Sequence, residues 1–333
     1  MVKDSDRNRE VGLDLVIPIY NEAAMIDPLF ERLSQVFSKD ALKLHGISLL
    51  RFILIDDGST DESARMIGEK IQNGAPAVLL RLSRNFGHQN AISAGFRHTS
   101  HDVVAIIDAD LQDPPEIILH MLKRWREGYD VVYGERRARK ENFLKVFSYW
   151  LYYRILSFFS EIPVPLDSGD FSLLDRKVVE AMNALPETLR FPRGLRAWVG
   201  FRQAALPYER ESRRAGSSKY TFRKLYYLAT DGLASMSIRP LKAAQFASFI
   251  FAGLALLFSF FLLARFNRIA SRDDSTIWFL MICLVVSLAA FVNLFCIYVL
   301  SAYVGRTYLE VKRRPSYVIM EVIGDRDGHR AGP

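Results

Sequence analysis

Short apolar runs alternate with amphipathic stretches through the first part of the chain. The runs are rich in Val, Ile and Leu, which is typical of strands buried in a sheet. The stretches between them repeat apolar residues at helical spacing, as Leu29, Leu33 and Phe37 do. This alternation predicts an α/β fold with a mainly parallel sheet covered on both faces. The predicted strands are 13–20, 49–55, 77–82, 103–107 and 130–134, and the predicted helices are 25–37, 62–71, 90–99 and 116–127.

Polar residues follow every predicted strand. Ligands of open parallel sheets bind outside the carboxyl ends of the strands, so we expect residues far apart in the sequence to line one crevice. These residues are Asn21, Asp56, Asp57, Arg84, Asp108, Asp110 and Arg136. The glycine signatures G-x-G-x-x-G and G-x-x-x-x-G-K-[ST] occur at none of the strand ends. Their absence from the sequence argues against a dinucleotide-binding fold and a P-loop ATPase.

The run 103–107 leads directly into Asp108 and Asp110, and the proline pair at 114–115 stops the strand from continuing. An isolated Asp-x-Asp pair is usually an acidic loop after a core strand. Here the two carboxylates and the neutral oxygen of Gln112 stand at the expected crevice. Such a donor set suits a hard divalent cation that keeps substrate phosphates among its ligands. The sequence therefore predicts a site for Mg²⁺ or Mn²⁺.

The middle of the chain contains two unusual segments. Residues 142–161 interleave aromatic, apolar and basic side chains at helical spacing. This pattern fits either a core-packing helix or an amphipathic helix in the membrane interface, and the mixture of aromatic and basic residues favours the second. A further interface helix is expected at 220–238. Residues 210–219 set basic side chains among Gly and Ser, which indicates either a solvated surface or a loop that grips phosphate.

Two long apolar stretches, about 241–265 and 277–304, are each of the length that a bilayer crossing needs. Lys and Arg residues flank the outer ends of this pair, which predicts a transmembrane hairpin with both ends in the cytoplasm. Residues 1–10 are polar and lack the apolar core of a signal peptide. A cytoplasmic domain at 11–238 and a cytoplasmic tail at 306–333 are therefore expected.

The composition narrows the classes of function. The chain has 333 residues, half of them hydrophobic, and a formal net charge of +7. A basic chain suits nucleic acid, anionic lipid or phosphorylated substrates. The cations gather at strand ends and beside the apolar stretches, which argues against nucleic acid. Both cysteines, Cys283 and Cys296, lie inside one apolar stretch and cannot build a disulfide framework or a zinc site.

Four motifs at strand ends resemble those of the family-2 glycosyltransferases of GT-A fold. They are VIPIYNE at 16–22, IDDGSTD at 55–61, RNFG at 84–87 and DADLQDPP at 108–115. The LQDPP extension is similar to the polyisoprenyl-phosphate branch, which includes the bactoprenol (undecaprenyl-phosphate) glucosyltransferases and dolichyl-phosphate mannose synthase. The similarity runs from residue 14 to about residue 322. It implies a Rossmann-like GT-A domain followed by the two-helix transmembrane hairpin.

The resemblance implies a role for each matching position. Catalysis is implied for Asp108, Asp110, Asp170 and Arg136. Nucleotide-sugar binding is implied for Pro18, Tyr20, Glu22, Asp56, Asp57, Arg84 and Asp108. The cation is assigned to Asp110 and Gln112, and the acceptor phosphate to Lys145, Ser148, Arg213, Arg214 and Lys219. Asp167 and Asp170 are expected to face the sugar, and the alternative for them is a capped turn before a helix. Ser217 departs from the acidic residue that is common in the family.

The resulting hypothesis is inverting transfer of one hexose, glucose from UDP-glucose, to undecaprenyl phosphate at the cytoplasmic face of a bacterial inner membrane. The resemblance also implies a homo-oligomer, such as a tetramer. Transfer of mannose, aminoarabinose or N-acetylhexosamine to the same lipid stays open. A processive polysaccharide synthase is disfavoured because residues 193–198 do not carry the Gln-x-x-Arg-Trp motif of that class. The non-enzymatic alternative is a membrane-anchored scaffold that binds nucleotide sugars.

Overall fold

The computed structural model describes residues 7, 9–136, 168–188, 190–210, 239–269 and 275–324. The interface helices expected at 142–161 and 220–238 lie outside these residues. So do Asp167 and the residues assigned to the acceptor phosphate, which are Lys145, Ser148, Arg213, Arg214 and Lys219. The chain divides into two compact units. The first contains the sheet and its helices, and the second contains the two long helices α10 and α11.

The described strands of the first unit form one mixed sheet in the order β7-β5-β6-β4-β1-β2-β3-β8. Their bounds are β1 Val11–Ile19, β2 Ile47–Asp56, β3 Ala77–Leu82, β4 Val103–Ile106, β5 Val131–Arg136, β6 Ser168–Asp175, β7 Gln203–Tyr208 and β8 Ile319–Ile323. Strands β4, β1, β2 and β3 run parallel, as do β5 and β7. Strands β6 and β8 pair antiparallel with their neighbours. The predicted mainly parallel α/β sheet is thus confirmed.

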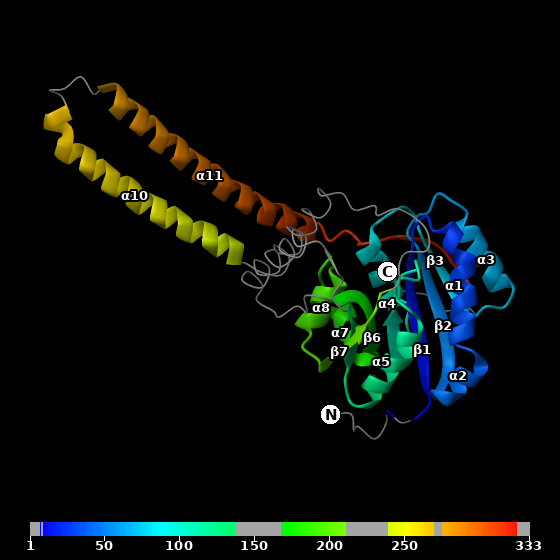
Figure 1. Cartoon of the computed structure of the whole chain (residues 1–333). Helices are drawn as coiled ribbons and strands as arrows, with labels where there is room; N and C mark the ends of the chain where they lie inside the picture. The colour runs from blue at the N-terminus through cyan, green and yellow to red at the C-terminus, as the bar shows by residue number, and fades with distance from the viewer. Residues whose placement is uncertain are drawn as a thin grey trace. The chain divides into compact units, whose positions relative to one another are not determined.

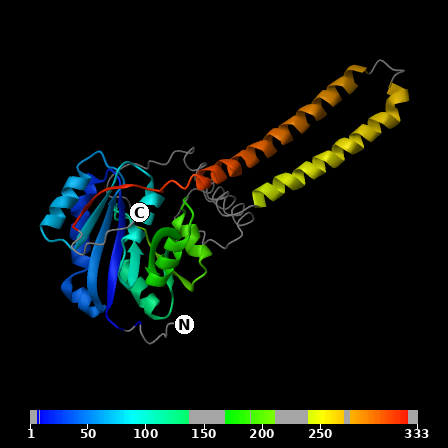
Figure 2. The ribbon, with the colours of Figure 1, turned by 180° about the vertical axis from the view of Figure 1, so that it is seen from behind.

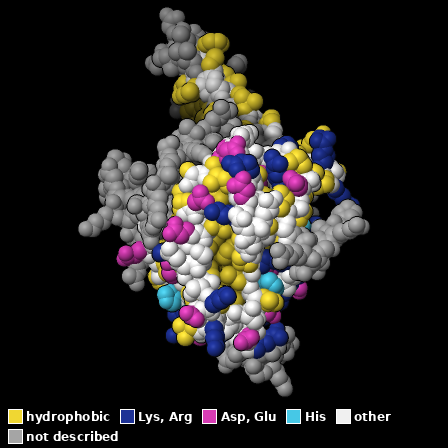
Figure 3. All heavy atoms as spheres, turned by 90° about the vertical axis from the view of Figure 1, so that its right-hand side faces the viewer, with side chains coloured by type: hydrophobic (Ala, Val, Ile, Leu, Met, Phe, Trp, Pro, Cys, Tyr) yellow, Lys and Arg dark blue, Asp and Glu magenta, His cyan; other side chains and the backbone are white. Residues whose placement is uncertain are grey.

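Helices cover both faces of the sheet (Figures 1 and 2). One apolar core packs against α1 (Ala23–Val36), α3 (Ser63–Gln72) and α5 (Glu116–Arg126). The other packs against α4 (His88–Arg97), α7 (Arg176–Ala184) and α8 (Pro192–Trp198). A short helix, α2 (Lys39–Leu44), precedes β2. On the face seen in Figure 3, basic and acidic side chains are interspersed.

The sheet opens at the carboxyl end of β1. Strand β2 pairs with β1 as far as Ile19, whereas pairing with β4 ends at Val16. Pro18 lacks an N–H donor, and it lies where β4 has already ended, so no ladder hydrogen bond is lost. Chain order also reverses here, because β2 continues on one side of β1 and β4 lies on the other. Such a switch point is where open α/β sheets bind ligands.

The long helices are α10 (Arg239–Ile269) and α11 (Ser275–Val311), which pack side by side in the second unit (Figure 1). Within α11, Met281–Val311 is long and apolar enough to cross a membrane. Among the described residues of α10, the apolar stretch Ala244–Phe258 is shorter than such a crossing needs. One spanning helix is thus supported by length and composition, and the first span of the predicted hairpin stays a prediction.

The chain returns to the first unit after α11. Residues in the range assigned to a C-terminal tail form β8, which pairs with the edge strand β3. Gly324 ends this segment with φ +89°, and a Cβ at this position would lie 2.7 Å from the Ala77 carbonyl oxygen. A residue with a side chain would therefore disturb the closure of β8 onto the sheet.

Candidate active site

Two loops at the switch point are joined by hydrogen bonds. The Asn21 backbone N–H donates to the Ser59 hydroxyl at 2.9 Å, and the Thr60 N–H donates to the Asn21 side-chain oxygen at 2.8 Å. Asn21 adopts φ 51°, a left-handed conformation that Asn tolerates well. These bonds fix the loop that carries Tyr20 and Glu22, two residues predicted to bind the nucleotide. Tyr20 is exposed, so its ring is accessible from solvent.

Asp57 holds the loop that follows β3. Its two carboxylate oxygens accept the backbone N–H groups of Phe86 at 2.7 Å and Gly87 at 2.9 Å. Burial raises the pKa of Asp57, although these hydrogen bonds favour the charged form. Gly58 lets the two loops approach, because a Cβ there would lie 2.4 Å from the backbone carbon of Arg84. The structure thus gives Asp57 a structural role in addition to the nucleotide contact predicted for it.

Asp56 and Arg84 lie next to the residues that form these hydrogen bonds. Asp56 is fully buried, and one carboxylate oxygen accepts the Ser59 N–H at 3.0 Å. The other oxygen lies 3.5 Å from Nε of Arg81 on β3. Arg84 is exposed, with its guanidinium 4.0 Å from the centre of the Phe86 ring. The predicted base-binding residues therefore lie on adjoining loops at one end of β1, β2 and β3.

A histidine lies between two of the predicted catalytic carboxylates. Nε2 of His88, the first residue of α4, is 3.7 Å from Asp108 and 3.5 Å from Asp170. Burial alone lowers the pKa of His88, but the hydrogen bond to Asp170 and the charges of Asp108, Asp170 and Asp57 outweigh it and raise the pKa to about 9. His88 is therefore a cation at neutral pH. Sequence reasoning missed it, although it directly follows the RNFG motif.

Asp108 and Asp170, the two carboxylates beside His88, differ in how readily they ionise. Burial raises the pKa of Asp108 to about 6, and the nearby Asp113, Asp170 and Asp110 add to the rise while His88 opposes it. Burial also raises the pKa of Asp170, but His88, Arg193 and Gln89 together hold it well below its usual range. Asp170 is thus ionised in a cationic surrounding, and Asp108 lies in an excess of negative charge.

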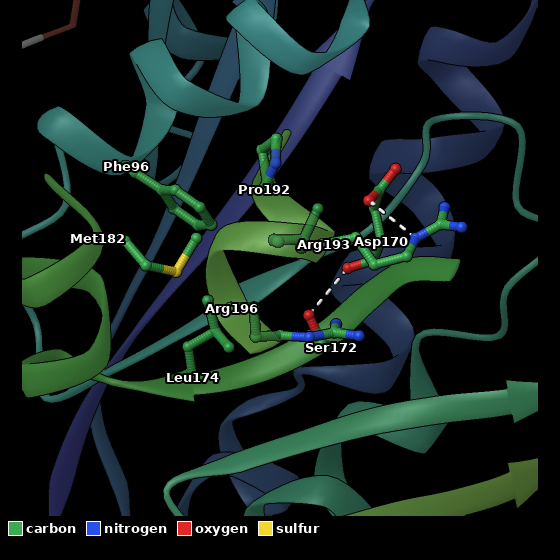
Figure 4. Close-up of a pocket in the computed structure, with 9 residues that line it drawn as sticks. Phe96, Asp170, Ser172, Leu174, Met182, Pro192, Arg193 and Arg196 are labelled. Atoms are coloured by element: carbon green, nitrogen blue, oxygen red, sulfur yellow. Dashed lines mark hydrogen bonds and ion pairs between the residues drawn. The ribbon is translucent and has the colours of Figure 1, made fainter. Parts of the chain in front are cut away.

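Asp170 lies on β6, and its support comes from α4 and α8; Figure 4 shows the contact from α8. The Arg193 Nε lies 3.7 Å from one carboxylate oxygen, and Gln89 donates to the other at 3.1 Å. Beneath them, Arg196 is buried over the Tyr133 ring, and burial lowers its pKa to about 10. Gln89, Arg193 and Arg196 were not predicted. They form a polar support around Asp170.

The turn after Asp108 carries backbone strain. Leu111 adopts φ 54° with a side chain that is 4% exposed, and the Gln112 N–H donates to the Asp110 carboxylate at 3.2 Å. A left-handed non-glycine residue costs about 1–3 kcal/mol and persists only where packing enforces it. Here burial of the Leu111 side chain in the core holds the turn, which sets Asp110 and Gln112 on either side of it.

The oxygen donors of this turn fit a hard divalent cation. Among the residues that the structure describes, no cluster of three or more His, Cys, Asp or Glu side chains is arranged as a metal cage. Asp110 and Gln112 contribute a carboxylate and an amide oxygen, and Asp108 adds negative charge beside them. Mg²⁺ typically takes one or two carboxylates and completes its shell with water and substrate phosphates. The site thus fits a cation that binds together with a diphosphate.

Arg136, at the end of β5, lies on the other side of this turn. Its guanidinium is 3.9 Å from the carboxylate of Asp113 and donates through Nε to the Tyr208 hydroxyl at 3.4 Å. Burial disfavours its charge, but Tyr208, Asp113 and Asp108 raise the pKa of Arg136 above its ordinary value. The crevice therefore combines acidic residues on β4 and β6 with a permanent cation on β5.

Comparison with known proteins places the chain in a family. The model of the family described as glycosyl transferase family 2 matches residues 14–182. The uncharacterized glycosyltransferase YkcC of Bacillus subtilis is 38% identical over 320 residues, covering 95% of this chain and 96% of that protein. The SfII prophage-derived bactoprenol glucosyl transferase of Shigella flexneri is 32% identical over 326 residues, covering 96% and 99%.

Among solved structures, the mannosyltransferase PcManGT from Pyrobaculum calidifontis, in complex with GDP-Man and Mn²⁺, is 18% identical. It matches with a TM-score of 0.45 and covers 87% of this chain and 88% of that chain. The family match and the curated relatives decide the class: this chain belongs to glycosyltransferase family 2. It is a glycosyltransferase with a GT-A sheet, as its strand-end motifs predicted.

Proposed function

We propose that this glycosyltransferase moves one hexose, glucose from UDP-glucose, to a polyprenyl phosphate such as undecaprenyl phosphate. The observation that carries the proposal is the match to the bactoprenol glucosyl transferase of Shigella flexneri, which spans 96% of this chain and 99% of that protein. The match is too long to stop at the catalytic unit, so it includes the long helices. A relative that shared only the donor site would match a shorter part of the chain.

A lipid acceptor explains why the chain contains two long apolar helices. Large apolar side chains are exposed along the described parts of α10 and α11, and a bilayer would cover them. We propose that both helices cross it. The chain leaves the first unit before α10 and re-enters its sheet as β8 after α11. This connectivity supports a helix pair with both ends on one side of the membrane, and therefore an even number of crossings.

The charge distribution supports a cytoplasmic catalytic unit. Basic residues follow the apolar part of α11, namely Arg306, Lys312, Arg313 and Arg314, and positive flanks favour the cytoplasmic side. The proposed location is a bacterial inner membrane. The predicted homo-oligomer stays a prediction.

Donor binding is assigned to the crevice at the end of β1. In this proposal Pro18, Tyr20, Glu22, Asp56, Asp57 and Arg84 border the base and ribose. Asp108 lies by the ribose or sugar, and Arg136 binds a phosphate. Mg²⁺ or Mn²⁺, when held by Asp110 and Gln112, supplies a positive charge that neutralises the leaving diphosphate.

The protein's part in the reaction is alignment and charge compensation. The acceptor is a phosphate monoester, which is largely ionised near neutral pH, so it needs little help from a general base. Arg136 remains charged and steadies phosphate oxygens in the transition state. Asp170, fixed by Gln89 and Arg193, faces the sugar in this proposal. A single in-line displacement at the anomeric carbon inverts its configuration.

The experiment is transfer by membranes that contain the full chain. The membranes are incubated with undecaprenyl phosphate and, one at a time, radiolabelled UDP-glucose, UDP-N-acetylglucosamine and GDP-mannose, and lipid-linked product is then extracted. We expect label from UDP-glucose in the lipid fraction only when the acceptor is added. Label from a different sugar would overturn the choice of glucose. Label in a polymer, or in no product, would overturn single transfer to a lipid phosphate.

A further inference from the structure

Asp113 belongs to the acidic motif at 108–115, yet its carboxylate contacts side chains of β5, β7 and the residues after β7. Its side chain is only 2% exposed. One carboxylate oxygen accepts the Tyr208 hydroxyl and the Arg210 Nε–H, the latter at 3.1 Å. The other oxygen lies 3.9 Å from Arg136. Its partners come from β5, from β7 and from the residues just after β7.

These contacts form a continuous chain of donors and acceptors. Tyr208 donates its hydroxyl proton to Asp113 and accepts the Nε–H of Arg136 at 3.4 Å. Burial and the charge of Asp113 raise the pKa of Tyr208, so the phenol keeps the proton that it donates. One buried carboxylate thus orients two guanidinium groups, one of them through a neutral hydroxyl.

Packing leaves little freedom to this arrangement. The Tyr208 ring packs edge-on against Phe171 of β6, with ring centres 5.4 Å apart. A Cβ at position 169 would lie 3.0 Å from an Arg136 nitrogen, so the backbone of β6 passes close beside the guanidinium. A buried carboxylate that is already held by charged and neutral donors is costly to leave without them. The cluster therefore has one favoured geometry.

We propose that Asp113 is a positioning residue, and not a ligand of the cation: through Tyr208 it holds Arg136 toward the diphosphate of the donor. This inference rests on the proposed function, because the diphosphate is the group that Arg136 is assigned to bind. It adds Asp113 and Tyr208 to the residues on which transfer depends. It also divides the acidic motif into residues 108–112, which bind the cation in this proposal, and Asp113, which positions Arg136.

The test is binding of a nucleoside diphosphate against a nucleoside monophosphate. The dissociation constants of UDP and UMP are measured with Mg²⁺ by calorimetry on the purified full chain in detergent. Asp113→Asn keeps the shape of the side chain but removes the charge. We expect it to weaken UDP binding by about 10-fold, the value of one charge-assisted hydrogen bond. UMP binding should change by less than about twofold, so the dissociation constant of UMP divided by that of UDP falls.

Two further variants identify the mechanism. Tyr208→Phe leaves the carboxylate, Arg210 and the direct 3.9 Å contact of Asp113 with Arg136 in place, but it removes the hydroxyl that bridges Asp113 and Arg136. It should lower the same ratio even if Asp113→Asn fails to fold. Arg136→Gln should lower it as well. Asp113→Asn combined with Arg136→Gln should lose no more than Arg136→Gln alone, because both changes remove one interaction.

The matched control is Asp14→Asn. Asp14 is likewise a buried carboxylate, with Arg51 and His101 as its neighbours, but it lies near the start of β1. This variant should lose stability and keep the wild-type ratio. A wild-type ratio in Asp113→Asn or Tyr208→Phe, beside a reduced one in Arg136→Gln, would overturn the inference alone. Recovery of Asp113→Asn at high Mg²⁺ would do the same, since it would indicate a cation ligand. Failure of the wild-type chain to bind either nucleotide would overturn the proposed function together with the inference.

Discussion

At the scale of single residues, the role of each charged group in the site depends on which neighbours it contacts. Five aspartates lie at the strand ends around His88 and Arg136, and the described contacts divide them by task. Asp57 holds a loop, Asp170 is held by α4 and α8, and Asp113 faces β7. Asp108 and Asp110 are the two that we propose to face the donor.

Asp110→Asn tests the catalytic role of Asp110 separately from any role in folding. The amide oxygen of Asn can still accept the Gln112 N–H, so the free energy of unfolding should change by less than about 1 kcal/mol. Loss of the charge that holds the cation should lower kcat on the order of 100-fold or more. Transfer to lipid phosphate and chemical denaturation measure the two effects.

Asp27→Asn is the control for that variant. Asp27 lies on α1, where it pairs with Lys70 at 2.6 Å on the surface, and such pairs contribute little. Its transfer rate should stay within about twofold of the wild type. Substantial transfer by Asp110→Asn with added Mg²⁺ would contradict the assigned role.

Asp14 offers a test of pH dependence. Burial raises the pKa of Asp14, but hydrogen bonds from His101 and Arg51 lower it to about 2, below its ordinary value of 3.8. A carboxylate with a depressed folded-state pKa stabilises the fold above its unfolded pKa and loses that effect as pH falls through the folded pKa. The shift corresponds to about 2 kcal/mol.

Urea unfolding of wild type and Asp14→Asn at stepped pH measures this contribution. The variant should be less stable at pH 7, and the gap between the two proteins should narrow as pH falls from about 4 to about 2. A gap that is constant over this range would show that the ionised form of Asp14 does not stabilise the fold.

At the scale of elements, β8 closes the edge of the sheet beside β3. Edge strands expose unpaired backbone groups, and β8 covers those of β3 at Leu79 to Leu82. It also brings Glu321 to 3.7 Å from Arg81, whose Nε lies 3.5 Å from Asp56. The segment that follows α11 therefore contacts Arg81, which in turn contacts Asp56.

Gly324→Ala tests how firmly β8 is attached. The added Cβ would clash with the Ala77 carbonyl oxygen and with Ile71, and the backbone has φ +89°. We expect destabilisation of about 1–3 kcal/mol and faster proteolysis near β8. Gly74→Ala is the matched control, because φ is +91° there but no atom lies within 4 Å of the Cβ. Equal losses in both variants would show that backbone strain, not contact with β3, is the cause.

The elements that sequence reasoning predicted are those with a local signal. The strands β1 to β5 and the helices α1, α3, α4 and α5 were predicted within a few residues, since each is a clear apolar or amphipathic run. Strand β6 was missed because it inserts between β4 and β5 far from either in sequence. Strand β8 was missed because Glu321 interrupts its short apolar run and its partner β3 lies more than two hundred residues earlier.

Prediction of the site residues from the sequence was limited in the same way. Strand ends and motifs indicated Asp56, Asp57, Asp108, Asp110 and Arg136, because chain topology alone brings these residues to one edge. His88, Tyr208 and Arg193 could not be found this way. Their importance comes from which carboxylate they touch, and that depends on side-chain packing between distant elements.

At the scale of the whole molecule, the proposed hairpin predicts on which side of the membrane each end of α11 lies. In a background of Cys283→Ala and Cys296→Ala, Ser275→Cys marks the start of α11 and Lys312→Cys marks its end. With a hairpin, a membrane-impermeant maleimide should label Ser275→Cys in intact spheroplasts and Lys312→Cys only after permeabilisation. Labelling of both positions, or of neither, in intact spheroplasts would contradict two crossings.

The position of β8 in the chain has a consequence for biosynthesis. A ribosome releases β1 to β7 first, then α10 and α11, and β8 only afterwards. If α10 and α11 cross the membrane as proposed, β3 stays uncovered while these helices are inserted. Insertion then precedes completion of the sheet, and a chain that failed to insert would have to complete its sheet with both apolar helices still in water.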